Sequence, residues 1–517
     1  MVKKLPLIAL LLLVISTSSG AIERFEKLNW INANSSVVNL IQFPQLVERV
    51  YRENNDNLIW FDVDQALRFE FQLEMIKRAR ISTLFSSQLS YLQFYRKANR
   101  WFEYDILATD TMLLYMSYAE QAPINGGGWF FEKQFASFLP EPSESAVLEL
   151  FIAVNLNQLD NIIDMYTPVS GGYKELLKSY AHLKQYADKT VNVYKQVGVK
   201  KAGDSLPNKA ALIERLNLLD IKIDKRSLRN NIYDRHLVKS VRKFQKSHGL
   251  KDNGKLDPVT VKWLNVPVKE RLSMLALNAE RLRLWPEPKD SLIIVNVPNF
   301  EMKYWQSGIE VFESKVVVGR KSRKTPVMET NLDSLVLNPA WNVPWKIMVA
   351  DIIPRVKNDT KYLIENGIEI VEKWSDEKTI DPSEIQWAAV NPYKFPYKMR
   401  QRPGNINALG LYKFNTPNPR AIFLHDTPSK DLFKKDIRAF SSGCIRIEKA
   451  GLFANLLLNT QVEPTISADK PESATQFIPL KEAIPVHIIY QTVWFESGQV
   501  QYRDDVYNYD SFSYTKG

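Results

Sequence analysis

The apolar residues of this 517-residue chain change their spacing near residue 290, and that change limits what the chain can fold into. Before it, in segments such as 65–80, 86–98 and 146–166, apolar side chains recur at helical spacing with charges between them. After it, 291–297 and 311–318 alternate in the manner of strands. We therefore expect an α+β chain of roughly three domains, helical first and mainly β afterwards.

The helical half carries no catalytic signature. We expect 173–196 to continue the helical pattern, and 124–128, with its three consecutive glycines, to form a loop. The aromatic stripes of this half are expected to be core.

Composition excludes several classes of protein. The chain is 45% hydrophobic and 24% charged, which is globular rather than disordered or collagen-like. A net charge of +10 suits an acidic partner surface without identifying one, and we expect no nucleic-acid partner. One cysteine rules out an intramolecular disulfide and a Cys-rich zinc site, and five scattered histidines argue against a His-rich metal centre. We expect no metal and no cofactor.

Residues 1–21 have the three parts of a secretory signal. Lys3 and Lys4 form the positive end, 5–15 is an apolar run, and 16–21 supplies small residues for cleavage. The run is shorter than the roughly 20 residues that span a membrane. An uncleaved anchor is the alternative. We expect an exported, periplasmic chain without a transmembrane segment after cleavage. A lone cysteine is unusual in such a compartment, and is either a core residue or a nucleophile.

Residues 205–266 read as a compact helical unit. One helix is expected to stop near His248, and Asp257 is expected to cap a second helix that has Pro258 at its first position. The stretch VKSVRKFQKSHGLKDNGKLDPVTVKWLN resembles the small three-helix peptidoglycan-binding domain.

The chemically informative residues follow in the β half. An apolar strand leads to His425, and 19 residues later a turn containing Ser442 and Gly443 leads to Cys444. A reacting thiol needs a nearby imidazole, and the N–H groups of Gly443 and Cys444 are candidates to face an oxyanion. Arg446 shares a face with Cys444 in an extended chain. It would lower the thiol pKa or hold a substrate carboxylate, unless it forms a structural ion pair.

This order, His, a gap and then Ser-X-Gly-Cys-X-Arg, resembles the signature of the YkuD-type L,D-transpeptidases. Ser442 stands where the common form of the family has His, which resembles the large YcbB-like periplasmic subclass and leaves His425 as the only base. The resemblance extends over roughly 205–500 and includes these further segments: Val318-Gly319-Arg320, Lys324-Thr325-Pro326, Leu337 to Pro344, Met399 to Gly404, Asn407 to Gly410 and Pro485-Val486-His487.

The resemblance implies a reaction on peptidoglycan that carries tetrapeptide stems. Cys444 would attack the carbonyl of the L-centre of a diamino acid, D-Ala would leave, and an amine of another stem would resolve the thioester as a 3→3 crosslink. His425 would be the general acid and base, oriented by the main-chain carbonyl of Asp426. The side chain of Asp426 is a weaker candidate, because neighbouring side chains diverge in an extended segment. Carbapenems are the inhibitors expected for this family.

The aromatic and basic segment 345–405 resembles the capping insertion of the subclass, which would exclude water from the site. Candidate substrate contacts are Arg446, Ser442, Tyr397, Arg400 and Trp345, with packing as the alternative for each one. The expected domains are a signal peptide (1–21), a helical scaffold (22–204), a peptidoglycan-binding-like module with a linker helix (205–285), the catalytic domain (286–505) and a C-terminal tail (506–517).

Two other functions stay open. An L,D-carboxypeptidase would share the acylation and use water in the second step. A non-catalytic wall-binding scaffold would keep the fold, but it has no need of both Cys444 and His425. The expected partners are peptidoglycan and other cell-wall synthesis proteins.

Overall fold

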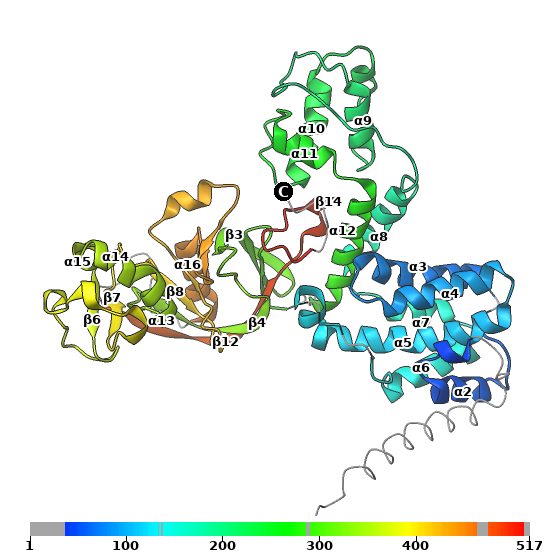
Figure 1. Cartoon of the computed structure of the whole chain (residues 1–517), viewed down its shortest axis with the longest axis horizontal. Coiled ribbons are helices and arrows are strands. Elements are labelled where there is room, and N and C mark those ends of the chain that lie inside the picture. The colour runs from blue at the N-terminus through cyan, green and yellow to red at the C-terminus, as the bar shows by residue number, and fades with distance from the viewer. Residues whose placement is uncertain are drawn as a thin grey trace, which may run out of the picture.

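The computed structural model describes residues 37–60, 62–132, 134–135, 138–285, 290–462 and 474–510. The expected signal peptide and residues 511–517 of the expected tail lie outside the described residues. The architecture is α+β, as predicted: helices occupy one end of the molecule and the sheet and a smaller lobe the other (Figure 1). Within the described ranges, no helix combines the length and apolar character needed to cross a bilayer.

The first helical region is built around one long helix, α5 (Trp101–Gly127), in which every side chain from Tyr104 to Tyr118 is buried. A helix that is buried all round belongs at the centre of a bundle. Around it lie η1 (Val38–Leu40), α2 (Pro44–Glu53), α3 (Val63–Ala79), α4 (Leu84–Lys97), a π-turn η2 (Gly128–Glu132), α6 (Glu144–Asn155), α7 (Leu159–Met165) and α8 (Gly171–Lys184).

Three expectations for this region were wrong. Residues 124–128 are not a loop, because α5 continues through 127 and places Gly126 so close to Leu284 that a Cβ there would lie 2.1 Å from its Cδ2. The glycine therefore serves tertiary packing. The expected helix 146–166 is two helices, α6 and α7, and the expected helix 173–196 ends at Lys184.

The second helical unit contains α9 (Lys209–Asn217), η3 (Lys225–Leu228), α10 (Arg235–Ser247) and α11 (Pro258–Leu264). The side chain of Asp257 accepts a hydrogen bond from the Thr260 N–H at 2.8 Å and Pro258 opens α11, as predicted. The following helix, α12 (Val268–Arg281), ends in η4 (Leu282–Leu284) and packs against both α3 and α8. It joins the two helical units into one continuous core.

The described residues of the β half form a nine-stranded sheet in the order β10-β3-β11-β9-β8-β4-β12-β1-β2. The helix α16 (Ala450–Gln461) covers one face, where Phe453 packs on aromatic rings of β2, β3 and β8. The strands are β1 (Leu292–Asn296), β2 (Glu301–Gln306), β3 (Ile309–Gly319), β4 (Met328–Leu337), β8 (Tyr412–Asn415), β9 (Leu424–His425), β10 (Ala439–Ser441), β11 (Ile445–Ile447) and β12 (Gln476–Ile489).

A hairpin of β13 (Val493–Glu496) and β14 (Gln499–Tyr502) follows β12 and returns to the helical units (Figure 1). β12 ends at Ile489 and β13 begins at Val493. A short 3-10 turn, η9 (Lys430–Lys434), lies between β9 and β10.

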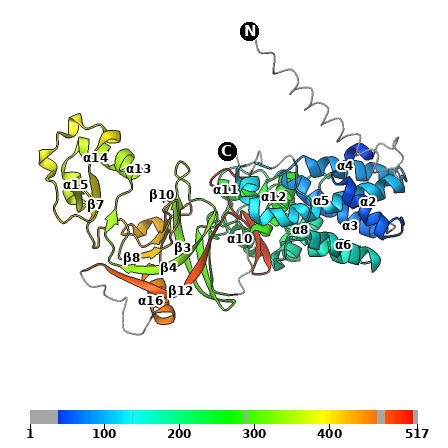
Figure 2. The same ribbon diagram turned by 90° about the horizontal axis from the view of Figure 1, so that it is seen from below.

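The insertion is a separate small lobe with its own hydrophobic core. It lies beyond the sheet, at the end of the molecule away from the scaffold helices (Figure 2). It contains β5 (Trp341–Asn342), α13 (Trp345–Ile347), a π-turn η5 (Met348–Ile352), α14 (Ile353–Asn358), α15 (Lys361–Glu365), β6 (Ile368–Val371), η6 (Pro382–Glu384), η7 (Trp387–Ala389), η8 (Pro392–Lys394) and β7 (Lys398–Gln401).

Candidate active site

The sheet places His425 in a row of polar side chains. On β9, His425 pairs with Arg446 of the parallel strand β11 and with Lys413 of the antiparallel strand β8. Side chains of directly paired residues project from the same face of a sheet. Lys413, His425 and Arg446 therefore line one face, and Cys444, two residues before Arg446, lies at the start of the same row.

The imidazole of His425 is buried and its orientation is fixed. Its Nδ1 lies 2.5 Å from the main-chain carbonyl oxygen of Asp426, the contact that the family resemblance implies. Burial and then the nearby Arg446 lower the pKa of His425 to about 3, while the carbonyls of Asp426 and Leu409 act in the opposite direction. The ring is thus neutral at physiological pH, which is the form that accepts a proton.

The carboxylate of Asp426 faces away from the imidazole. It accepts a hydrogen bond from the Leu411 N–H at 3.0 Å and from Lys430 Nζ at 2.5 Å. It also fills the space beside Gly410, where a Cβ would lie 2.3 Å from Asp426 Oδ2. Only the main chain of Asp426 is thus placed to orient His425, as the divergence of neighbouring side chains predicted.

A tight turn presents Cys444. Gly443 has φ +127°, a conformation that other residues rarely adopt. Ser441 Oγ donates to the Cys444 carbonyl at 2.6 Å, and Thr325 Oγ1 donates to the Gly443 carbonyl at 2.7 Å. The turn is therefore held from inside and from the loop that follows β3.

The same turn alters the expected oxyanion hole. The N–H of Gly443 donates to Ser441 Oγ at 3.1 Å, so it is already engaged rather than free. Among the described residues, the N–H of Cys444 has no acceptor. A developing oxyanion at this turn would thus meet the Cys444 N–H first.

The thiol of Cys444 is partly buried and uncharged in the resting site. Its Sγ lies 3.6 Å from the Ala421 carbonyl oxygen, which is its acceptor in this structure. Burial raises the thiol pKa, while the Phe423 backbone, Lys413 and Arg446 act to lower it. The thiol and the imidazole are thus both uncharged in the resting site, and they do not form an ion pair.

Arg446 faces the thiol without a carboxylate partner. Burial lowers the pKa of its guanidinium and the Cys444 thiolate raises it, and Nε is buried without a hydrogen-bond partner among the described residues. The structural ion pair weighed as the alternative is therefore absent from the described part of the chain. An unpaired buried donor favours a ligand acceptor at this position.

Ser442 connects the turn to the inserted lobe. Arg323 NH1 donates to Ser442 Oγ at 3.0 Å, and the same guanidinium pairs with Asp351 of η5. Arg320 also reaches Asp351, at 3.3 Å. We call Arg320, Arg323 and Asp351 the latch. It ties the lobe to the residue that stands two positions before Cys444.

The other predicted contacts differ in availability. The guanidinium of Arg400 is fully engaged inside the lobe by Glu369 and by the carbonyls of Trp374 and Asp376, so it is not free for substrate. Tyr397 packs edge-on against Phe395. Trp345 is 48% exposed. Their sequence types suggested binding, but the lobe uses the first two for its own packing.

Sequence reasoning missed Lys413 and the latch. Lys413 Nζ lies 4.7 Å from the centroid of the Phe423 ring and contributes to the field at both Cys444 and His425. Its role depends on the pairing of β8 with β9. Thr325 stood in a segment noted for resemblance, but its bond to the turn depends on long-range pairing.

The catalytic half is similar in sequence to proteins of a known family. Residues 290–463 match the family described as "L,D-transpeptidase catalytic domain", of the YkuD type. These residues are a YkuD L,D-transpeptidase domain. The helical units match two further families: 45–179 a "Scaffold domain" and 211–264 a "Putative peptidoglycan binding domain". All three domain types were predicted from the sequence.

A curated relative supports the same assignment. A protein of Haemophilus influenzae named "Putative L,D-transpeptidase" is 39% identical over 242 residues, which cover 46% of this chain. The match spans about half of the relative, 48% of its length. The L,D-transpeptidase from Xylanimonas cellulosilytica, known from its crystal structure, is 12% identical over 57% of this chain and 99% of its own, with a TM-score of 0.19.

Proposed function

We propose that this chain is an L,D-transpeptidase that forms 3→3 crosslinks in peptidoglycan through a thioester on Cys444. The observation that carries the proposal is the shared face of β8, β9 and β11, on which a buried, neutral His425 is paired with Arg446, two residues after Cys444, and Arg446 Nε has no hydrogen-bond partner among the described residues. The catalytic domain type and the accompanying peptidoglycan-binding module support peptidoglycan as the substrate.

In the first step, His425 takes the thiol proton as Cys444 Sγ attacks the carbonyl of the diamino acid in a donor stem. The S–C bond forms, the bond from this carbonyl carbon to the D-Ala nitrogen breaks, and His425 returns the proton to the leaving amine. The N–H of Cys444 faces the developing oxyanion. Arg446 supplies a positive charge for a stem carboxylate or for the thiolate.

In the second step, an amine of another stem attacks the thioester. His425 removes a proton from this amine, the N–C bond forms, the C–S bond breaks, and the thiol recovers its proton. The latch holds the inserted lobe at the turn, which favours exclusion of water. This contact favours transfer over hydrolysis, although a carboxypeptidase would use the same acylation.

The proposed location is the periplasm. Peptidoglycan lies outside the cytoplasm, so a chain that acts on it requires export, for which residues 1–21 have the composition. The mild basic excess suits stems that carry carboxylates.

Two experiments test the proposal. Intact-mass measurement after incubation with a carbapenem is expected to give one covalent adduct, which Cys444→Ala abolishes while the fold persists. Muropeptide analysis after incubation with tetrapeptide dimers is expected to yield 3→3 products. Trimmed stems alone would assign the carboxypeptidase, and absence of both adduct and products would leave the wall-binding scaffold.

A further inference from the structure

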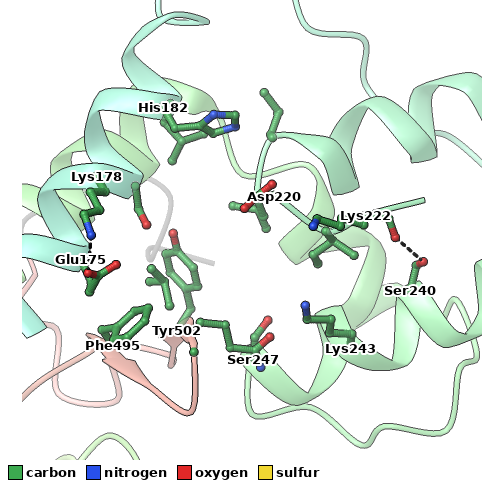
Figure 3. A pocket seen from close by; sticks show the side chains of 18 of the residues that line it. Glu175, Lys178, His182, Asp220, Lys222, Ser240, Lys243, Ser247, Phe495 and Tyr502 are labelled. Carbon is green, nitrogen blue, oxygen red and sulfur yellow. Dashed lines mark hydrogen bonds and ion pairs between the residues drawn. The ribbon is translucent and has the colours of Figure 1, made fainter. Parts of the chain in front are cut away.

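A large pocket lies where three parts of the chain meet, and it shares no residue with the catalytic turn. Its volume is about 730 Å³, within the range of about 300–1,000 Å³ that is typical of ligand sites. Helix α8 of the first helical region, helix α10 with the segment 218–222 that follows α9, and the β13–β14 hairpin each contribute a wall (Figure 3). A ligand here would contact all three parts at once.

The walls of this pocket carry unpaired positive charge. Lys222, Lys239 and Lys243 have no carboxylate partner among the described residues, whereas Lys178 is paired with Glu175 at 2.6 Å. The other acidic group in the lining is Asp220, which Figure 3 shows beside Lys222. Four lysines thus face two carboxylates, and three of the lysines keep their charge available.

The pocket also offers uncharged contacts. Nε2 of His182 is buried and has no hydrogen-bond partner within the described ranges, although the residue lines the cavity. The rings of Phe495 and Tyr502 form the hairpin side of the pocket (Figure 3). A buried polar atom without a partner costs stability unless a ligand or water satisfies it. The site therefore combines lysine side chains, one buried polar atom without a hydrogen-bond partner, and apolar surface.

The arrangement of the lysines indicates the kind of anion. Lys239 and Lys243 are four residues apart on α10, so their Cβ atoms are roughly 5–6 Å apart, and Lys222 comes from another segment. Arginine binds a carboxylate or phosphate through a planar fork, whereas lysine acts as a point charge, and the lining contains no arginine. Spread point charges suit a ligand whose carboxylates are distributed along an extended body.

We propose that this pocket binds the peptide stem of a peptidoglycan strand, at a distance from the reacting stem, through the stem carboxylates. This inference rests on the proposed function, because it takes the same polymer as its ligand. Binding at the junction fixes the helical units and the catalytic domain on one strand. The pocket thereby raises the effective concentration of neighbouring stems at Cys444.

The test uses the full chain with Cys444→Ala, so that ligand is bound without turnover. The probe is a soluble, uncrosslinked peptidoglycan oligomer with tetrapeptide stems. Lys239→Glu combined with Lys243→Glu is expected to weaken binding about tenfold, because two attractions become repulsions of the size of surface ion pairs. The matched control is Lys251→Glu with Lys255→Glu, which makes the same charge change in the same module outside the pocket and is expected to change affinity less than about twofold.

Three further measurements make the outcome decisive. Glycan strands stripped of stems are expected to bind both double variants equally, and inorganic pyrophosphate is expected not to compete with the oligomer. Equal affinity of the pocket variant and its control would overturn the proposal, as would preferential binding of pyrophosphate. With Cys444 intact, the Lys239/Lys243 variant is expected to form the carbapenem adduct at the normal rate. Loss of adduct in the otherwise unaltered chain would instead count against the proposed function.

Discussion

At the scale of the residue, the charge states of His425 and Cys444 predict an unusual pH profile. The imidazole must be neutral to take the thiol proton, and its pKa of about 3 keeps it neutral above that pH. Burial raises the thiol pKa, so the thiolate form contributes nothing to the acylation rate near neutral pH. We expect the rate of carbapenem acylation to be flat from about pH 5 to about pH 8, with no inflection near the ordinary histidine value of about 6.5.

The control for this profile is His425→Ala. This variant is expected to lose the plateau, and its rate is expected to rise with pH as the Cys444 thiol loses its proton. Stopped-flow fluorescence or intact mass against time provides the rates. An inflection between about pH 6 and about pH 7 in the otherwise unaltered chain would mean that His425 is protonated in the resting site.

At the scale of the element, alanine substitutions at the two glycines that end α5 are expected to have opposite effects on stability. A Cβ at Gly126 would lie 2.1 Å from Leu284 Cδ2, so Gly126→Ala overpacks the contact between α5 and η4 and is expected to cost about 1–3 kcal/mol. Gly127 has nothing within 4 Å of its Cβ position, so Gly127→Ala is expected to stabilise by about 0.5–1 kcal/mol. Thermal unfolding of both variants checks the sign, and a stabilising Gly126→Ala would contradict the packing.

The latch is a second prediction at this scale. Asp351→Asn leaves Arg320 and Arg323 without their carboxylate, and the partly buried pairs are each worth about 1 kcal/mol. We expect the ratio of hydrolysis to crosslinking to rise about fivefold, because the lobe no longer holds to the turn and water enters. Glu365→Gln, which removes one exposed charge from the same lobe, is the matched control and should leave the ratio unchanged.

These elements also mark what the sequence could predict. The helix cap at Asp257 can be recognised from a short stretch of sequence. The same holds for the pattern of His425 and Cys444, because both features depend on the residue types themselves. The continuation of α5 through Gly126 and Gly127 could not be predicted, because helix propensity there is overridden by contact with Leu284, more than 150 residues away. The latch and Lys413 were missed for the same reason: each depends on how distant strands or an insertion dock.

At the scale of the whole molecule, one buried ion pair joins the linker helix to the end of the β half. Arg281 NH1 lies 2.7 Å from Asp510 Oδ1, and both side chains are inaccessible to solvent. The guanidinium also lies 4.8 Å from the centroid of the Phe131 ring, which belongs to the first helical region. This point therefore touches the scaffold, the linker and the β half.

Asp510→Ala removes one partner of this pair and strands a buried cation, which typically costs about 3–5 kcal/mol. We expect calorimetry to show the unfolding of the β half separating from that of the helical half, with the lower transition moving down. Arg281→Met combined with Asp510→Leu replaces both charges by apolar groups of similar size, so it should recover most of the loss, because the desolvation cost of the pair disappears with it. If the double variant were as unstable as Asp510→Ala, the coupling would reside in the hydrogen bonds that Asn278 makes to Thr492 rather than in this ion pair.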